Sequence, residues 1–240
     1  VKEVEASLRR LQTDWIDLYQ IHRWDPGTAH EETLGALTDL QRAGKIRYLG
    51  SSTYPPSAIV EAQWTAERRG LARFVCEQPP YSLLVRGIET EVLPTCERYG
   101  MGVIPWSPLA GGWLSGRFRK GADTTSHRAT RIPERYDLSI PGNQQKLEAA
   151  EQLAQLAEQA GVSLIHLALA FVIRHPTVTA AIIGPRTLEQ LEGQLGAVDV
   201  HLSNDVLDAI DAIVPPGTNL NPVDAGWRPP HLDEPASRRR

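Results

Sequence analysis

The stretch WIDLYQIHRWDPGTAHEETLGALTDLQRAGKIRYLGSS, residues 15–52, holds two apolar runs separated by one helical pattern. The first run ends at His22 and the second at Ser51, and both are rich in the β-branched and aromatic residues that favour buried strands. Between them, apolar residues recur at helical spacing from Glu31 to Arg42, and Gly44 follows where a left-handed C-cap is wanted. This order predicts two parallel strands joined by a helical crossover.

The same alternation continues along the chain. The predicted strands are Trp15–His22, Ile46–Ser51, Phe74–Gln78, Gly102–Trp106 and Thr179–Gly184. The predicted helices are Glu31–Arg42, Ser57–Arg69, Glu89–Tyr99, Gln144–Gln159, Ser163–Arg174, one that starts at Leu188, and Ser203–Val214. The first four strands follow one another at close to the ~30 residues per unit of a (β/α)₈ barrel. We therefore expect an α/β fold of the TIM-barrel type, with five strands in one domain over residues 1–240.

Composition narrows the class of protein. The chain has 240 residues, of which 41% are hydrophobic, so it can bury a core. A net charge of −4 without a basic stripe argues against a nucleic-acid or anionic-membrane surface. Cys76 and Cys96 lack metal-ligand spacing, which argues against a metal site or a disulfide framework and favours a reducing cytoplasm. No apolar run approaches the ~18 residues of a membrane span.

Two segments lack regular periodicity. Residues 109–142 are rich in Gly, Arg and Ser and are too long for a plain connection, so we interpret them as a functional loop over the site. Residues 215–240 form a Pro-rich C-terminal tail with Trp227 as its large anchor. This tail either folds across the mouth of the barrel or is disordered.

An anion site is predicted at Gly184-Pro185-Arg186-Thr187, where the last predicted strand turns into a helix. Thr187 and Gln190 fit a capping box, so free backbone N–H groups at the start of the helix face the strand end. Those donors, the helix dipole and the guanidinium of Arg186 would together hold a phosphate. The alternative is that Arg186 only solvates the turn.

In such barrels the chemistry lies at the carboxyl ends of the strands. His22 ends the first predicted strand and could donate a proton or a hydrogen bond to a carbonyl oxygen, although a lone histidine is more often structural. Trp106 and Ser107 end the fourth. The indole of Trp106 either fills the core or, with the amide of Gln78 nearby, stacks on a nicotinamide.

Four motifs now carry a family resemblance. They are TDWIDLYQIH (residues 13–22), GKIRYLGSS (44–52), WSPLAGG (106–112) and GPR (184–186). In this order and spacing the chain resembles the aldo-keto reductases, especially the branch that includes the potassium-channel β subunits and related bacterial oxidoreductases. The resemblance covers nearly the whole chain.

The resemblance implies an NADPH-dependent reduction of an aldehyde or ketone to an alcohol, with His22 as a catalytic residue and a small carbonyl compound as substrate. It assigns the nicotinamide carboxamide to Ser52, Thr53 and Gln78, although the family often has Asn or Arg where Thr53 stands. It places Trp106 against the nicotinamide ring. The residues assigned to the pyrophosphate are Ser107, Leu109, Gly111, Arg117 and Arg128. The residues assigned to the 2′-phosphate and adenine are Gly184, Arg186, Gln190 and Gln194. An arginine at this position favours NADPH over NADH.

One departure from the family concerns catalysis. The family's catalytic group is Asp, Tyr, Lys and His, and only His22 has a match, on what would be the fourth of eight strands. We therefore expect about the last five βα units of the barrel, with about 90 residues missing before Val1 at ~30 residues per unit. The two unpaired edges of such an open sheet predict association between copies.

Three functional hypotheses follow. The first is a carbonyl reductase whose N-terminal units are absent from this sequence. The second is an NADP(H)-binding module or sensor subunit without turnover, and the third is a non-functional remnant. Trp24, Trp113 and Trp227 are either walls of the substrate pocket or packing residues.

Overall fold

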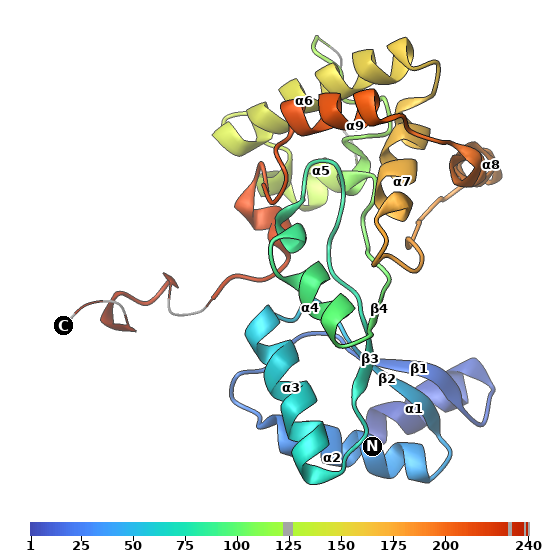
Figure 1. Ribbon diagram of the computed structural model, residues 1–240, viewed down its shortest axis with the longest axis vertical. Coiled ribbons are helices and arrows are strands. Elements are labelled where there is room, and N and C mark those ends of the chain that lie inside the picture. The colour runs from blue at the N-terminus through green and yellow to red at the C-terminus, as the bar shows by residue number, and fades with distance from the viewer. Residues whose placement is uncertain (122–126, 230–231, 238, 240) are drawn as a thin grey trace. The chain divides into compact units, whose positions relative to one another are not determined.

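A computed structural model describes residues 1–121, 127–229, 232–237 and 239, with the backbone alone for residues 127 and 128. The chain forms two compact units, whose elements are labelled in Figure 1. The sheet unit comprises Val1–Pro79 and Glu91–Ile104, and the helical unit comprises Pro80–Thr90 and Pro105–Arg240. The single domain expected from the sequence stays a prediction.

The sheet unit is built on parallel strands in the order β1-β2-β3-β4. The strands are β1 (Ile16–Ile21), β2 (Ile46–Ser51), β3 (Phe74–Glu77) and β4 (Gly102–Val103), and the helices are α1 (Lys2–Leu11), α2 (His30–Arg42), α3 (Pro56–Arg69) and α4 (Val92–Arg98). Helix α2 packs against β2 and α3, and α4 packs against α3 and β4 (Figure 1). The strand–helix alternation predicted for this part of the chain is confirmed.

The sheet register brings the ends of the strands level. Ile21 pairs with Ser51, and Ser51 pairs with Glu77. The register shifts between Leu49 and Gly50. A Cβ on Gly50 would lie 2.9 Å from the Gln20 side chain and 3.2 Å from a backbone oxygen of β3, so only glycine lets the strands approach here. The register therefore fixes which residues leave the sheet together at its carboxyl edge.

Two further results concern helix ends. The glycines predicted to follow helices, Gly44, Gly70, Gly100 and Gly161, all have left-handed φ values between 59° and 72°, which confirms them as helix terminators. Helix α1 was not expected from the sequence. Val4 and Leu8, four residues apart, are its buried face, and that spacing was the available signal.

The helical unit contains the remaining elements. They are η1 (Gly87–Glu89), η2 (Ala110–Gly112), α5 (His127–Arg131), η3 (Pro133–Arg135), α6 (Pro141–Gln159), α7 (Leu164–Arg174), α8 (Leu188–Leu195), η4 (Gly196–Asp199), α9 (Asn204–Ile213), η5 (Pro222–Ala225) and η7 (Pro235–Ser237). Helix α6 packs against α7 and α9, and α7 packs against α8 (Figure 1). The most apolar of these helices, α7, buries Leu167, Ala168 and Val172 in the core.

The prediction of a fifth strand over Thr179–Gly184 is wrong. This run makes a single isolated bridge, in which Ile182 pairs with Trp106 and donates its N–H to the Pro105 carbonyl at 2.9 Å. The predicted strand Gly102–Trp106 is likewise shortened to Gly102–Val103. On the side that faces Ile182, Pro105 offers a carbonyl but no N–H, so the bridge does not extend into a ladder there. The described chain therefore has one four-stranded sheet rather than five strands.

The C-terminal tail is ordered in part. Asn221 donates to the Asn143 side chain at 2.8 Å, and Leu220 donates its N–H to the Leu84 carbonyl at 3.2 Å, so this segment docks on the helical unit. In the described part of the chain, no single helix is long and apolar enough to cross a membrane. Helices α6 and α7 pass that test only as a pair, and they meet at an angle of 94°.

Candidate functional site

The carboxyl edge of the sheet gathers three of the predicted site positions in the sheet unit. His22 follows β1, Ser52 follows β2 and Gln78 follows β3. The Gln78 N–H donates to the Ser51 carbonyl at 2.9 Å, and the Ser52 hydroxyl donates to the Gln78 carbonyl at 2.9 Å. The structure thus brings Ser52 and Gln78 together, which is what parallel strands of matched register dictate.

His22 is linked to this edge through its neighbour Arg23. One nitrogen of the Arg23 guanidinium donates to the His22 carbonyl at 2.6 Å and lies 3.4 Å from the Ser52 hydroxyl. The His22 residue itself is exposed. Arg23 therefore holds the backbone on which His22 stands and leaves the imidazole accessible to a ligand. The sequence did not single out Arg23.

The turn after β2 is strained. Thr53 has φ 55°, and only three other non-glycine residues of the described chain have positive φ, namely Gln12, Ser107 and Ala110. A β-branched residue in this region is unfavourable unless its surroundings hold it there, and such residues cluster at functional sites. Thr53 is buried, so the surrounding structure can impose this conformation.

A buried carboxylate provides that support. Glu77, the last residue of β3, is fully buried, and its two oxygens accept from the Ser51 hydroxyl at 2.5 Å and the Tyr54 N–H at 3.2 Å. Glu77 therefore holds the residues on both sides of Ser52 and Thr53. Burial raises the pKa of Glu77 from 4.5 to about 7, although these hydrogen bonds and the charge of Arg23 oppose the rise. The sequence signal for it was a carboxylate at the end of the apolar run FVCE.

The helical unit carries the second strained segment, which begins at Trp106. Ser107, Ala110 and the two glycines after Ala110 have φ values of 62°, 49°, 69° and 106°. The Ala110 N–H donates to the Ser107 carbonyl at 2.8 Å, so the turn is closed by its own hydrogen bond. The loop that the resemblance assigns to the pyrophosphate is therefore a strained turn, and such conformations cluster at functional sites.

A pocket of about 150 Å³ opens beside this loop, within the helical unit. Its lining residues are Pro80, Tyr81, Ser82, Val85, Trp106, Ser107, Ala110, Gly111, Trp113, Ile132, Arg135, Tyr136 and Asp224. Of the predicted site residues, Trp106, Ser107 and Gly111 lie in it, whereas Leu109 and the exposed Arg117 do not line it. Four of its thirteen lining residues are aromatic, and polar groups come from the loop and the C-terminal segment.

Trp113 is a packing residue that also lines this pocket. It is 1% exposed and stacks on Phe118 and Tyr136 at ring-centroid distances of 4.6 and 5.7 Å. The Tyr136 hydroxyl donates to the Gly111 carbonyl at 2.8 Å, which ties the strained loop to this aromatic stack.

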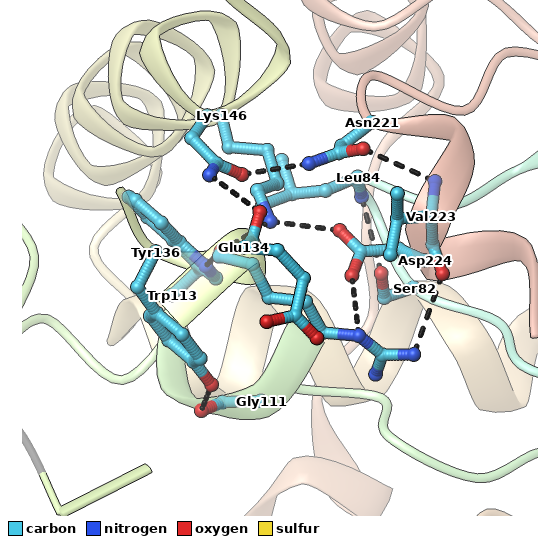
Figure 2. A network of polar contacts seen from close by, with 12 residues as sticks. Ser82, Leu84, Gly111, Trp113, Glu134, Tyr136, Lys146, Asn221, Val223 and Asp224 are labelled. Carbon is cyan, nitrogen blue, oxygen red and sulfur yellow. Dashed lines mark hydrogen bonds and ion pairs between the residues drawn. The ribbon is translucent and has the colours of Figure 1, made fainter. Parts of the chain in front are cut away.

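A buried ion pair lies beside the aromatic stack (Figure 2). Lys146 is 1% exposed and donates to Asp224 and to the Arg135 carbonyl, both at 2.8 Å. Burial lowers the pKa of Lys146, and Asp224 opposes this. The sequence reasoning missed Lys146, Arg135 and Asp224. Lys146 alone had a signal, because it lies four residues before Ala150 on the apolar face of α6.

The predicted anion site at the start of α8 forms as a capped helix. The Thr187 hydroxyl accepts the Gln190 N–H at 3.2 Å, which confirms Thr187 as the N-cap. The Gln190 side chain accepts the N–H of Arg186 at 2.9 Å, one residue before the cap. Arg186 is exposed, and among the described residues its guanidinium has no hydrogen-bond partner.

Two other predicted positions differ in accessibility. Gln194 lies one turn beyond Gln190 on α8, is 8% exposed, and its side-chain oxygen has no partner among the described residues. Gly184 is exposed. The side chain of Arg128 lies outside the described residues.

Comparison with known proteins gives a consistent result. Residues 1–215 match the model of the Aldo/keto reductase family. The uncharacterized oxidoreductase YrpG of Bacillus subtilis is 40% identical over 226 residues, which are 94% of this chain and 67% of that protein. The aldo-keto reductase dtxS3 of Metarhizium robertsii is 37% identical and covers 84% of this chain, and the match spans 53% of that protein. A putative voltage-gated potassium channel subunit beta of Schizosaccharomyces pombe is 32% identical, over 95% of this chain and 66% of its own length. The chain thus spans between about half and two thirds of these relatives.

Proposed function

Because the chain belongs to the aldo/keto reductase family, we propose that it binds NADP(H) and serves the NADPH-dependent reduction of an aldehyde or ketone to an alcohol. The observation that carries the proposal is the exposed guanidinium of Arg186 at the N-terminus of α8, which has no partner among the residues that the structure describes. NADPH differs from NADH only by a 2′-phosphate, and a phosphate is what a helix N-terminus with an arginine binds.

The residues of α8 suit the adenosine end of the cofactor. Arg186 offers a planar fork of donors, and the backbone N–H groups of the first turn add partial positive charge. Glu189 in that turn offsets part of this field. The buried side-chain oxygen of Gln194 has no donor in the described part of the chain, and an adenine amino group is a donor that would satisfy it. Both the charge and the unmet acceptor fit NADP(H).

The residues of the sheet edge suit the nicotinamide carboxamide. Ser52 and the strained Thr53 are held by Glu77, and Gln78 follows the same strand as that carboxylate. When bound, the cofactor would supply the hydride. The exposed imidazole of His22 can donate a hydrogen bond to a carbonyl oxygen, and in its charged form it can hold the proton that the developing alkoxide needs. The other residues assigned to the cofactor would orient it and exclude water from the site.

Binding without turnover is the second candidate. The positions assigned to the cofactor fall within these 240 residues, whereas only His22 of the four family catalytic groups has a match.

The proposal extends to the fold and to assembly. We propose that the chain corresponds to about the last five βα units of a (β/α)₈ barrel, of which β1–β4 are four strands, and we expect copies to associate through the edge of β1.

The test is the variant Arg186→Glu, which places a negative charge where the 2′-phosphate would lie. We expect the Kd for NADPH to rise roughly 10- to 100-fold in calorimetric titration, because hydrogen bonds to charged groups contribute this much free energy. The Kd for NADH should change little. Arg174→Glu, at the exposed end of α7, is the matched control with no expected change.

Equal weakening of both nucleotides by Arg186→Glu would contradict the phosphate assignment. Oxidation of NADPH that depends on added aldehyde then separates the two candidates, because a binding module gives tight binding and no turnover.

A further inference from the structure

Arg135 is held by contacts to both its side chain and its backbone carbonyl. Its side chain pairs with Asp224 at 3.5 Å and donates to the Val223 carbonyl at 3.3 Å. Its own carbonyl accepts from Lys146 at 2.8 Å and from the Trp113 indole at 3.3 Å. Backbone and guanidinium are therefore both held, and Arg135 is one of the residues that line the pocket.

Arg135 belongs to a group of three charged side chains with a net positive charge. Asp224 is shared between Arg135 and Lys146, so one carboxylate faces two cations and the trio keeps one net positive charge. Lys146 is almost fully buried and lies 4.9 Å from the Trp113 ring, where little water screens it. Glu134 is exposed and is outside the pocket lining. A guanidinium has five N–H donors, and Asp224 and Val223 engage only part of this set.

The C-terminal segment provides this arrangement. Asn221 caps η5 by accepting the Val223 N–H at 3.1 Å and donates to Asn143 of α6 at 2.8 Å. A Cβ on Gly142 would lie 2.9 Å from the Leu220 carbonyl, so the segment packs directly on the start of α6. Figure 2 shows Asn221, Val223 and Asp224 on one side of Lys146. The segment thus delivers Asp224 to the two cations.

We propose that Arg135 binds a phosphate oxygen of the cofactor's pyrophosphate in this pocket, and that Asp224 and Lys146 position it. This inference rests on the proposed function, which assigns Ser107 and Gly111 of the same pocket to the pyrophosphate. A cavity of about 150 Å³ has room for a group the size of benzene, which is enough for one phosphate group.

The first experiment compares two nucleotides and two arginines by calorimetric titration. Arg135→Met should weaken NADPH and NADH by the same factor, roughly 10- to 100-fold, because both contain a pyrophosphate. Arg186→Glu should affect NADPH alone. Arg131→Met, an exposed arginine four residues earlier that does not line the pocket, is the control and should change neither. Arg135→Lys should recover part of the loss, since it keeps the charge and loses the fork.

Asp224 is tested as a positioning residue. Asp224→Asn should weaken both nucleotides severalfold, and Asp224→Glu should restore part of the affinity. Circular dichroism checks that each variant is folded. Inorganic pyrophosphate is a second probe that needs no nucleotide, and it should change the fluorescence of the wild-type tryptophans but not of Arg135→Met, because Trp106 and Trp113 line the pocket.

The outcomes separate the two proposals. If the wild-type chain binds neither nucleotide, the proposed function fails, and a pyrophosphate response that Arg135→Met abolishes still supports an anion pocket. If Arg135→Met is folded and binds both nucleotides like the wild type, or weakens NADPH alone, the inference is overturned. A wild type that shows no response to pyrophosphate and a nucleotide affinity insensitive to Asp224→Asn would overturn it as well.

Discussion

The sheet unit and the helical unit hold their candidate site residues by different means. In the sheet unit, the Ser52 hydroxyl donates a hydrogen bond to the Gln78 carbonyl. The fully buried Glu77 holds the turn after β2 by accepting hydrogen bonds from it. In the helical unit, cations are either exposed, as Arg186 is, or held by ion pairs, as Arg135 is. The first arrangement follows from strand register, and the second depends on individual charges. Substitutions should therefore affect the two units differently.

The largest effect is expected where the helical unit depends on a buried charge. Arg86 is 5% exposed at its side chain, pairs with Glu89 at 2.8 Å and with Asp211 at 2.7 Å, and donates to the Val214 carbonyl at 2.6 Å. Arg86→Ala removes the donor from Asp211 and from the Val214 carbonyl, whereas Glu89 keeps the Tyr81 hydroxyl and the Gly217 N–H. Breaking a buried pair from one side costs about 3–5 kcal/mol, and we expect this loss in denaturant unfolding.

The matched control is Arg69→Ala in the sheet unit. Arg69 also pairs with a glutamate, Glu31 at 3.0 Å, but both side chains are more than half exposed. Such a pair contributes about 0–1 kcal/mol, so the control should change stability little. Equal losses for the two variants would contradict the view that burial, and not the ion pair itself, makes the helical unit sensitive.

The next effect concerns the carboxylate of the sheet unit and appears as pH dependence. The pKa of Glu77 is about 7 in the fold against an ordinary value of 4.5, so between these values the folded state holds a proton that the unfolded state has released. Stability therefore falls as the pH rises from about 4.5 to about 7, by about 3 kcal/mol at most. Glu77→Gln cannot titrate, and its stability should lack this fall.

The amide of Glu77→Gln can keep both contacts, since its oxygen can accept the Tyr54 N–H and its NH₂ can donate to the Ser51 hydroxyl. The measurement is urea unfolding at several pH values. Glu97→Gln, on the exposed side of α4, should retain the wild-type slope. If the free energy of unfolding changes with pH in the same way for the wild type and for Glu77→Gln, Glu77 is charged throughout this range. Other interactions then offset the cost of burying its charge.

Local signals explain how much of the fold was predictable. Strand–helix alternation and the left-handed glycines gave β1–β3 and most helices nearly to the residue, because these features depend on near neighbours. The run Thr179–Gly184 was misjudged. Its apolar pattern is that of a strand, but pairing depends on the partner segment, where Pro105 offers no N–H.

The residues of the candidate site likewise fall into predictable and unpredictable ones. Strand ends and helix caps, such as Ser52 and Thr187, follow from position in the chain and were predictable. Arg135 and Asp224 were not, because they are 89 residues apart and their pairing arises only when the C-terminal segment docks on α6. The roles of all these residues in cofactor binding stay predictions.

The smallest expected effect concerns the start of α8. The variant Thr187→Ala tests whether the first turn of this helix can be destabilised without a change in the rest of the helical unit. Thr187→Ala removes the hydroxyl that accepts the Gln190 N–H at 3.2 Å. Loss of an N-cap costs about 1 kcal/mol, and here the cost falls on a helix whose first residues are exposed. Hydrogen exchange should therefore speed up in the first turn of α8 while protection in α7 is unchanged.

Ser203→Ala is the matched control, because Ser203 caps α9 through the Val206 N–H at 3.3 Å and lies far along the chain from Arg186. Both variants should lose a similar stability, but only Thr187→Ala should weaken NADPH, and by a few-fold, since it loosens the backbone donors beside the guanidinium. If both variants weaken NADPH alike, the effect is one of overall stability, and the α8 terminus is not the phosphate site. If neither does, Arg186 acts without help from the helix.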